Sequence, residues 1–481
     1  MSFSDFVSSV SGWVWGMPVI LFLMGMGLYF SIRTRFLQVR YFKSMVTMLF
    51  RGKSSARGIS SFQSFALALS GRVGTGNIAG VATAIALGGP GSVFWMWLIA
   101  FLGAGTAYAE AALGQVYKEK IDGHYRGGPA YYILRGLRSR GFAVAFAAIM
   151  IAAVGLLLPG VQGNAICDAF RVSFGVEERV TAGVVVLLLA LVIFGGVKRV
   201  ARVAEVVTPF MAVGYLVVAV VVLSFRYEAL PGMFSLILRG AFGLEPAMGG
   251  MLGAAISMGV KRGMFSNEAG QGTAPHAAAA CEVRHPARQG LVQAFSVYVD
   301  TLLVCSATAL MILSTGMFRV YDGAGGVVFD GGGLPAGVTD YGPVYTQLSV
   351  DATFPGLGAA FVAVSLFFFA FTTIMSYYFQ AETNVYFICR RGRWSRRAIN
   401  GLRLAVLAVT YFTAINTMQL AWDLADIGMG LMAWFNLVAL LLLRKTALRT
   451  FSDFERQRGQ GVLDPTFHAG QSGVRGAVEW E

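Results

Sequence analysis

Two clusters of glycine and polar residues interrupt apolar stretches that are otherwise long enough to cross a membrane. The first, residues 70–77, reads Ser-Gly-Arg-Val-Gly-Thr-Gly-Asn, and the second, residues 263–272, reads Gly-Met-Phe-Ser-Asn-Glu-Ala-Gly-Gln-Gly. An unpaired backbone N–H or C=O in hydrocarbon costs several kcal/mol, so irregular backbone persists there only where it lines a protected cavity. Paired interrupted helices in the two halves of a membrane protein therefore indicate the binding site of a transporter.

The first cluster has the chemistry to bind a small zwitterion and a monovalent cation. Gly71, Gly74 and Gly76 allow backbone angles that a helix forbids, and Thr75 and Asn77 add short polar side chains. Freed carbonyl groups can replace the water around Na⁺, and the positive end of the helix that restarts after the break attracts a carboxylate. The alternative is that the glycines only let neighbouring helices pack closely.

The second cluster places a carboxyl group and two polar side chains at membrane depth, in the sequence Ser266-Asn267-Glu268. Such groups are costly in hydrocarbon unless they face a wet cavity. Phe265 could form one wall of an apolar pocket. For Glu268 two roles stay open, because its carboxyl group could bind a cation or could cap free backbone donors of the broken helix.

Other polar residues inside predicted spans could support the same site. Gln162 and Asn164 come at the end of the fourth apolar span, and Thr372 and Thr373 lie among phenylalanines in the ninth. The two threonine hydroxyl groups could complete the coordination of Na⁺, or they could bond back to carbonyls of their own helix. His276 follows Pro275 where the second broken helix restarts, and we expect it to be structural and not a proton relay.

The elements that position these residues must be membrane helices. The chain has 481 residues, of which 56% are apolar and only 13% charged, and its mean hydropathy is +0.64. That composition indicates a polytopic membrane protein. The net charge of +13 is distributed in short blocks between apolar runs, which indicates topology and not a nucleic-acid-binding surface. The four cysteines are scattered without metal-ligand spacing, so neither a disulfide framework nor a metal site is predicted.

The criterion of roughly twenty residues per crossing predicts about eleven transmembrane helices. They lie near residues 14–32, 60–87, 92–117, 142–163, 180–197, 205–225, 248–280, 288–316, 355–382, 399–418 and 422–443. The interrupted spans are the second and the seventh, so two sets of five follow one extra N-terminal helix. An odd number of spans per set makes the sets insert in opposite directions, which is an inverted repeat.

These spans divide the chain into an N-terminal helix with a basic loop (1–58), a ten-helix core (59–443) and a polar tail (444–481). The two repeats of the core cover about residues 59–228 and 245–443. Basic residues gather in every second loop, after spans 1, 3, 5, 7 and 9, whereas the loop after span 8 is acidic. The positive-inside rule then predicts an external N-terminus and a cytoplasmic C-terminus in the cell (inner) membrane. From Thr450 onward we expect no regular structure.

Several short motifs, in order along the chain, resemble those of the alanine or glycine:cation symporter family. They are Gly-Thr-Gly-Asn-Ile-Ala-Gly-Val-Ala at 74–82, Gly-Gly-Pro-Gly at 88–91, Phe-Trp-Met-Trp at 94–97, Arg-Gly-Gly-Pro at 126–129, Gln-Gly-Asn at 162–164, Met-Phe-Ser-Asn-Glu-Ala-Gly at 264–270 and Asp-Thr-Leu-Leu-Val-Cys at 300–305. The resemblance runs from about residue 13 to about residue 443. It implies an all-α LeuT-type fold and Na⁺-driven uptake of a small neutral amino acid, alanine or glycine.

The resemblance also implies roles for single residues. Substrate would contact Thr75, Gly76, Gln162, Phe265 and Ser266, and Na⁺ would meet the carbonyl groups of Ser70 and Val73 with the hydroxyl groups of Thr372 and Thr373. Many family members have Gly-Trp where this chain has Ser376-Tyr377. If Tyr377 lines the pocket, its hydroxyl makes that wall more polar. Arg72, inside the first break, is expected to point to the cytoplasmic vestibule and to pair with an acid.

We therefore expect a secondary symporter that works by alternating access, with a small neutral amino acid, Na⁺ and the lipid bilayer as its partners. No nucleic acid and no obligate protein partner is predicted. A proton-coupled symporter of the same fold is the rival, although the absence of lysine from residues 205–225 favours Na⁺ by the resemblance. An ion channel would need a pore-lining repeat, usually built by symmetric subunits. A membrane-embedded enzyme would need paired catalytic groups, which the scattered histidines do not supply.

Overall fold

The computed structural model describes residues 3–50, 58–121, 123–389, 393–416 and 418–480. Its helices and strands follow one another in this order: α1 (Phe3–Val14), α2 (Met17–Arg33), α3 (Leu37–Arg40), α4 (Phe42–Leu49), α5 (Ser61–Arg72), η1 (Gly76–Gly80), α6 (Val81–Gly88), α7 (Ser92–Val116), β1 (Glu119–Ile121), β2 (His124–Arg126), α8 (Pro129–Gly136), α9 (Arg140–Ala152), η2 (Ala153–Leu157), α10 (Leu158–Phe174), α11 (Glu178–Ile193), α12 (Val197–Phe225), η3 (Tyr227–Ala229), α13 (Leu230–Ala241), η4 (Pro246–Met251), α14 (Leu252–Asn267), α15 (Ala274–Ala280), α16 (Pro286–Val297), η5 (Tyr298–Cys305), α17 (Ser306–Thr315), β3 (Arg319–Tyr321), β4 (Val327–Asp330), α18 (Pro343–Asp351), α19 (Gly358–Cys389), α20 (Arg393–Ala414) and α21 (Met418–Gly459). Of the η elements, η1, η2 and η5 are π-helical.

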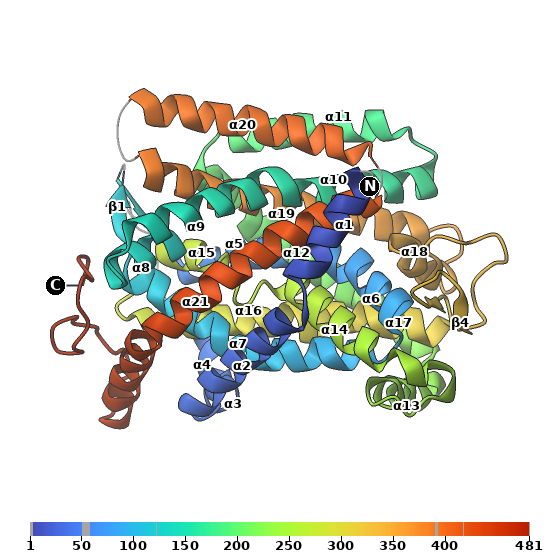
Figure 1. The fold of residues 1–481 in the computed structure, drawn as a ribbon, viewed down its shortest axis with the longest axis horizontal. Helices are drawn as coiled ribbons and strands as arrows, with labels where there is room; N and C mark the ends of the chain where they lie inside the picture. The colour runs from blue at the N-terminus through green and yellow to red at the C-terminus, as the bar shows by residue number, and fades with distance from the viewer. Residues whose placement is uncertain (1–2, 51–57, 122, 390–392, 417, 481) are drawn as a thin grey trace.

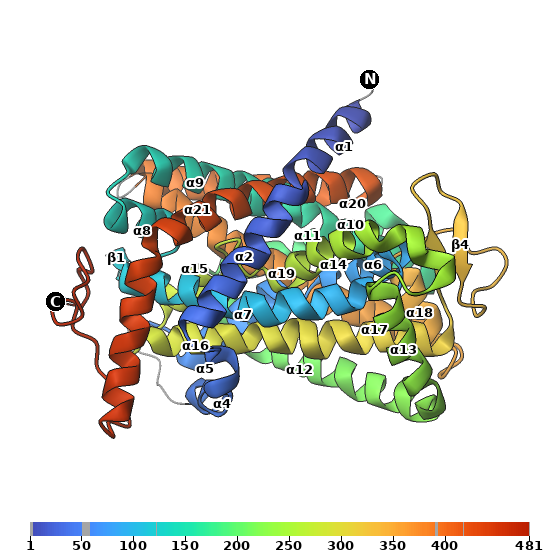
Figure 2. The same ribbon diagram turned by 60° about the horizontal axis from the view of Figure 1, so that its bottom comes forward.

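Most long helices lie side by side in one bundle (Figures 1 and 2), with β1 and the C-terminus at one end and β4 and α18 at the other. Within the described residues, seven helical stretches are long and apolar enough to cross a membrane. The remaining predicted spans correspond to the two broken helices and to α11 and α20, so each predicted span is helical. The prediction of an all-α membrane protein is confirmed.

Both predicted interruptions are present. Helix α5 begins with a capping box between Ser60 and Gln63 and ends at Arg72, after which Val73 adopts an extended backbone. The chain becomes helical again in the π-helix η1 and continues as α6. Helix α14 ends at Asn267, and Glu268 follows with a left-handed backbone at φ 56°. An irregular turn then leads into α15.

Small residues let α7 pack directly against the second broken helix. A Cβ atom on Gly114 of α7 would lie 2.8 Å from the carbonyl oxygen of Pro275 in α15, closer than real Cβ contacts come. On the other half, a Cβ on Gly263 of α14 would lie 2.7 Å from the Cγ2 atom of Ile99 in α7. The two halves of the broken helix are therefore held against one continuous helix, which fixes the position of the break between them.

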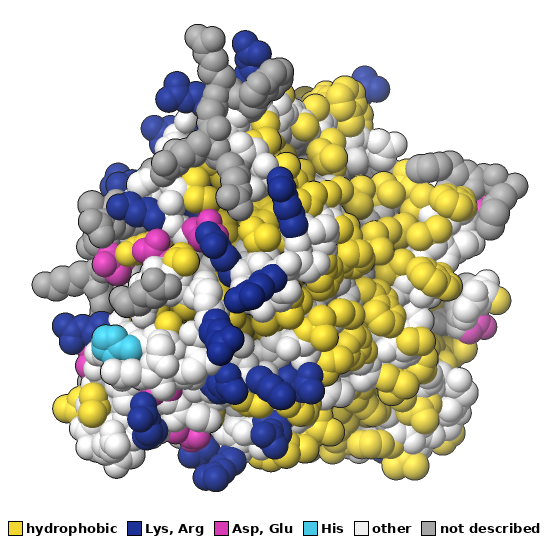
Figure 3. Space-filling model, turned by 60° about the vertical axis from the view of Figure 1, so that its left-hand side comes forward, with side chains coloured by type: hydrophobic (Ala, Val, Ile, Leu, Met, Phe, Trp, Pro, Cys, Tyr) yellow, Lys and Arg dark blue, Asp and Glu magenta, His cyan; other side chains and the backbone are white. Residues whose placement is uncertain are grey.

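The outward-facing side chains suit a hydrocarbon environment. On α12 the residues Val206, Phe210, Val213, Val217 and Val220 are all exposed large hydrophobic residues. Their spacing of alternately four and three residues places them on one face of the helix. In Figure 3, Lys and Arg side chains gather beside a broad hydrophobic surface on the end of the molecule that carries the C-terminus. A basic rim next to an apolar belt is typical of the boundary between membrane and cytoplasm.

The expectation of an unstructured tail after Thr450 is wrong. Helix α21 continues to Gly459, and the residues after it pack against the bundle. The backbone N–H of Phe467 donates to the carbonyl oxygen of Arg284 at 2.9 Å. The indole N–H of Trp480 donates to the carbonyl oxygen of Gln115 at 2.9 Å. The composition of the tail is polar, yet a few widely spaced apolar side chains, Phe467 and Trp480 among them, are enough to dock it.

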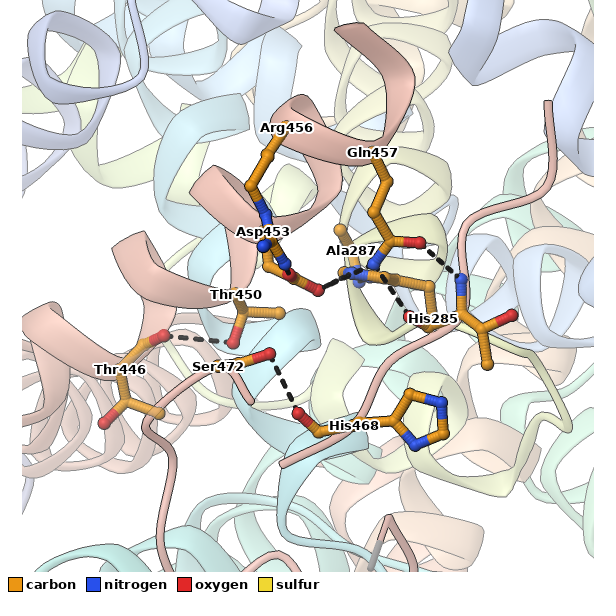
Figure 4. Close-up of polar contacts among 10 residues, drawn as sticks. His285, Ala287, Thr446, Thr450, Asp453, Arg456, Gln457, His468 and Ser472 are labelled. Atoms are coloured by element: carbon orange, nitrogen blue, oxygen red, sulfur yellow. Dashed lines mark hydrogen bonds and ion pairs between the residues drawn. The ribbon is translucent and has the colours of Figure 1, made fainter. Parts of the chain in front are cut away.

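The same end of the molecule holds a buried polar contact between the tail helix and α16. The Asp453 carboxylate lies 3.2 Å from Nε2 of His285 and 2.9 Å from Nε2 of Gln457, and it also bonds to Arg456 (Figure 4). Burial lowers the pKa of His285, although the hydrogen bond to Asp453 opposes the shift. Burial alone would raise the pKa of Asp453, but hydrogen bonds from His285 and Arg456 bring it to about 2.

This contact predicts acid sensitivity of the docked tail. His285 is held neutral below its ordinary pKa of about 6.5, so its contribution to stability is present above that pH and is lost as the pH falls further. Asp453 stays ionised throughout this window. The apparent melting temperature of the purified protein should fall between pH 7.5 and pH 5.5. His285→Gln should flatten that fall, and an identical fall in this variant would contradict the assignment.

Candidate functional site

The first break is held by side chains in place of helical hydrogen bonds. The backbone N–H and the hydroxyl group of Thr75 both donate to Oε1 of Gln162 in α10, at 3.0 and 2.7 Å. The backbone N–H of Gly74 donates to Oδ1 of Asn77 at 2.8 Å. These three polar side chains are buried. The family resemblance groups Thr75 with Gln162, and the structure places their side chains in contact.

The two breaks touch at a glycine. A Cβ atom on Gly76 would lie 3.0 Å from Cδ1 of Phe265 and 3.1 Å from the Cα atom of Ser266. The ring of Phe265 also packs on Trp422, with a distance of 4.7 Å between the ring centroids. Only glycine fits this approach without displacement, so η1 of the first break lies against the end of α14 in the second.

Asp300 joins the two breaks through its carboxylate. The hydroxyl group of Ser266 donates to both carboxylate oxygens at 2.8 and 3.0 Å, and Nδ2 of Asn77 donates to Oδ1 at 2.7 Å. Thr301 donates to Oδ2 at 2.7 Å. Asp300 lies in the π-helix η5, a conformation that recurs at functional sites. Sequence reasoning gave it no role, although a lone acid inside the apolar run of the eighth span was a signal that could have found it.

Oxygen atoms of the first break converge on α19. The hydroxyl group of Thr373 donates to the carbonyl oxygen of Ser70 at 2.9 Å and to the carbonyl oxygen of Val73 at 3.3 Å. These are hard, uncharged oxygen donors, which suit a monovalent cation at an unwound helix. Both threonine hydroxyl groups also donate to the carbonyl oxygen of Phe369 in their own helix, at 3.0 Å for Thr373 and 3.1 Å for Thr372, but within the described part of the chain the Thr372 hydroxyl has no hydrogen bond to the first break. The structure therefore places Thr373 at this cluster and turns Thr372 away from it.

The remaining residues of the second break, Asn267, Glu268 and Thr273, are also buried. The Thr273 hydroxyl donates to Oε2 of Glu268 at 2.7 Å, and Tyr377 interacts with the same carboxyl group. No backbone N–H among the described residues donates to that carboxyl group. It is Oδ1 of Asn267 that accepts a backbone N–H, from Ala269, at 3.0 Å. Of the two roles left open for Glu268, the capping of backbone donors belongs to its neighbour.

The predicted orientation of Arg72 is wrong. Its side chain is buried, and Nη1 donates to the carbonyl oxygen of Gln293 at 3.0 Å and to the hydroxyl group of Ser296. Its Nε and Nη2 atoms have no hydrogen-bond partner within the described part of the chain. Helix packing against α16 encloses this residue, which sequence position alone could not reveal.

Two further predicted residues are anchored elsewhere. Nδ2 of Asn164 donates to the carbonyl oxygen of Asn416 at 2.7 Å, which ties α10 to the end of α20. Nδ1 of His276 lies 2.9 Å from the carbonyl oxygen of Thr273, and Nε2 lies 2.9 Å from Nδ2 of Asn384. Both ring nitrogens of His276 are thus occupied by structural contacts.

A polar vestibule of about 540 Å³ opens at the end of the bundle that carries β3 and β4, and its lining includes Arg262, Trp422 and Asp426. The guanidinium group of Arg262 stacks over Trp422 at 4.1 Å and bonds to Asp426 at 3.2 Å. Lys261 lies 2.6 Å from the same carboxylate. Because Trp422 also packs on Phe265, these side chains separate the vestibule from the two breaks. Sequence reasoning did not identify this ion cluster.

Two broken helices that enclose a buried polar site below a vestibule define a secondary transporter of the LeuT type. The structure of MhsT in complex with L-phenylalanine has this fold: its TM-score is 0.59 at 15% identity, over 83% of this chain and 93% of that one. The model of the sodium:alanine symporter family matches residues 1–469. The chain belongs to that family.

Two curated bacterial relatives are similar over nearly their whole length. The putative sodium/proton-dependent alanine carrier protein YrbD of Bacillus subtilis is 54% identical over 479 residues, which cover 99% of this chain and 98% of the relative. The sodium/proton-dependent alanine carrier protein of Bacillus sp. strain PS3 is 46% identical over 439 residues, which cover 91% of this chain and 97% of the relative.

The contact between the breaks predicts a sharp difference between two glycines of η1. Gly76→Ala should weaken uptake of labelled alanine about 5- to 150-fold, because forcing a methyl group into a packed site costs about 1–3 kcal/mol. Gly80→Ala is the matched control, since its Cβ would meet only Trp422 at 3.8 Å and the Thr75 carbonyl oxygen at 3.9 Å. Equal loss in both variants, at equal expression, would show that the contact has no special role.

Proposed function

We propose that this protein is a Na⁺-coupled symporter that imports a small neutral amino acid, alanine or glycine, by alternating access. The observation that carries the proposal is the dual use of the first break. Its carbonyl groups at Ser70 and Val73 meet Thr373, and the next residues, Thr75 and Gly76, face Gln162 and Phe265. An ion bound to the carbonyls would order the backbone that binds the solute, which is a coupling free energy between two sites.

The site residues take complementary parts in this proposal. The carboxylate of the amino acid would bind near the N-terminal turn of η1, at Thr75 and Gly76, where the helix dipole is positive. Gln162 and Ser266 would hold the polar part of the solute, and Phe265 with Tyr377 would close the pocket. A Cβ atom at Gly76 would already crowd Phe265, which supports a solute with a short side chain.

We further propose that residues 59–443 form the ten-helix core and that the C-terminus is cytoplasmic in the cell (inner) membrane. The basic rim at the end that carries the C-terminus supports this orientation (Figure 3). The vestibule at the opposite end would then receive solute from outside. Alternation of basic and acidic loops along the sequence favours the same orientation.

The driving force is adequate for concentrative uptake. One charge that moves through ~100 mV supplies roughly 2.3 kcal/mol, before any contribution from the Na⁺ gradient itself. That energy corresponds to about 1.7 decades of concentration. Proton coupling in place of Na⁺ remains the competing proposal, and the names of the two relatives include both ions.

Uptake of labelled alanine by proteoliposomes tests the proposal directly. Replacing external Na⁺ by K⁺ at fixed pH should abolish accumulation, and a thermal-shift screen of the twenty amino acids should show stabilisation that depends on Na⁺. Uptake that is independent of Na⁺ but driven by a pH gradient would identify the proton, and not Na⁺, as the coupled ion. Stabilisation by a different amino acid would change the substrate and leave the mechanism in place.

Substitution of the ninth-span hydroxyl groups tests the ion site. Thr373→Ala should raise the Na⁺ concentration for half-maximal uptake by about tenfold or more, because a polar contact to a charged group contributes about 1.5–3 kcal/mol. Thr372→Ala should raise the same concentration less, since among the described residues only the Thr373 hydroxyl of the two also bonds to the carbonyl groups of Ser70 and Val73. Equal effects would place both hydroxyl groups on the ion, and no effect of Thr373→Ala would remove it from the site.

A further inference from the structure

The segment that follows α21, residues 460–480, folds back onto the end of the bundle that carries the C-terminus (Figure 1). We call this segment the C-terminal strap. An amide pair fixes its base to α21: Nε2 of Gln457 donates to the carbonyl oxygen of Thr466 at 2.8 Å, and the backbone N–H of Thr466 donates to Oε1 of Gln457 at 3.0 Å. Nη1 of Arg449 also donates to the carbonyl oxygen of Gly473 at 2.9 Å. The strap is therefore anchored to the long helix that precedes it.

Two aromatic side chains let the strap contact the bundle. Phe467 is 2% exposed and Trp480 is 9% exposed, and their rings meet edge to face with 5.6 Å between the centroids. The Phe467 ring also lies 5.2 Å from the ring of His285, which directly precedes α16. The backbone N–H of Phe467 donates to Arg284, and the indole N–H of Trp480 donates to Gln115. The strap therefore covers both the segment that joins α15 to α16 and the C-terminal end of α7.

The end of α15 is held by two residues that Trp480 contacts. Nε2 of Gln115 donates to the carbonyl oxygen of Cys281 at 2.8 Å, and Nζ of Lys118 donates to the same oxygen at 3.2 Å. Nζ of Lys118 lies 4.8 Å from the centre of the Trp480 ring, and this lysine is only 3% exposed. Hydrogen bonds are stronger where water is kept away. Removal of the indole ring would therefore weaken the hold on Cys281.

Cys281 lies at the point where the two broken helices are joined. The backbone N–H of Ile59, before α5, donates to the carbonyl oxygen of Ala280 at 3.0 Å, and the N–H of Glu282 donates to the carbonyl oxygen of Ile59 at 3.3 Å. These bonds form a parallel β-bridge between Ile59 and Cys281. The Cys281 side chain is fully buried, and its Sγ accepts a hydrogen bond from Nε2 of Gln289 at 3.1 Å. The strap is thus docked on the joint between α5 and α15.

This joint closes one of the two routes from the breaks to water. The other halves of the broken helices, α6 and α14, face the vestibule, and Thr83, Leu87 and Met258 contribute to its lining. Helices α5 and α15 lie toward the opposite end, where every residue of α15 is buried. A solute that leaves toward that end must pass α5 and α15, so their joint has to open.

We infer that the C-terminal strap is a latch that holds this joint closed, so that release of the strap favours opening at the end that carries the C-terminus. The inference rests on the proposed function, because alternating access requires this end to open, and it adds a control on that step. Helix α21 supplies the fixed base of the latch. Trp480 is its releasable end, because undocking of this side chain admits water to Gln115 and Lys118.

Cys281 is a natural reporter of the joint. With the other three cysteines replaced by alanine, a charged maleimide should modify the purified protein only when α5 and α15 separate. Trp480→Ala should raise the rate of modification about tenfold or more, because loss of the indole hydrogen bond and ring contacts favours the undocked strap. Trp480→Phe keeps an aromatic ring but lacks the N–H group, so it should give a smaller rise. Val478→Ala is the matched control, because Val478 is a strap residue that is 41% exposed, and it should keep the wild-type rate.

A second background that keeps only Cys167 distinguishes a latch from a general stabiliser of the fold. Cys167 is buried in α10, and its Sγ donates to the carbonyl oxygen of Glu178 at 3.5 Å. Trp480→Ala should leave the modification rate of Cys167 unchanged at a temperature well below melting. A parallel rise at Cys167 and Cys281 would overturn the inference, because it would report loosening of the whole molecule.

Equal rates of Cys281 modification in wild type and Trp480→Ala would also overturn the inference. If Trp480→Ala does not fold, Trp480→Phe decides by the same comparison. Modification requires no transport. A failure of Na⁺-dependent alanine uptake by the wild-type protein would therefore count against the proposed function, and the rates at Cys281 would still decide whether the strap holds the joint closed.

Discussion

The structure depends on one constraint, which is that backbone groups released from helices inside a membrane must find other partners. Gln162 meets the N–H and hydroxyl groups of Thr75, and Asn77 meets the N–H of Gly74. Thr373 meets the carbonyl groups of Ser70 and Val73. Each partner is a neutral side chain that can exchange its hydrogen bond for a solute or an ion. The hydrogen bonds that stabilise the broken helices are therefore the same hydrogen bonds that a bound ligand can replace.

The second general feature is the way the two broken helices are joined. They come from distant parts of the sequence, yet Asp300 bonds to Asn77 of the first and to Ser266 of the second. A carboxylate with donors from both breaks makes their positions interdependent. A change in the position of one break therefore alters the position of the other, without a direct contact between ion and solute.

Much of the fold and part of the site could be predicted from sequence, because hydropathy and glycine content act locally. The position of both breaks followed from where polar residues interrupt apolar runs. The grouping of Thr75 with Gln162 and of Thr373 with the first break followed from the family resemblance. What could not be predicted depends on contacts between distant elements. The burial of Arg72 against α16 and the docking of Trp480 onto α7 are of this kind, since composition reports polarity and not partners.

Access to the two breaks is blocked by different structures at the two ends of the bundle. On its side, Trp422 and Phe265 separate the breaks from the vestibule. Toward the C-terminal end, all of α15 and most of α5 are buried. Rotamer changes take picoseconds to nanoseconds, whereas shifts of packed helices take microseconds to milliseconds. Opening the breaks toward the vestibule would thus need rotation of side chains, whereas opening them toward the C-terminal end would need the slower movement of packed helices.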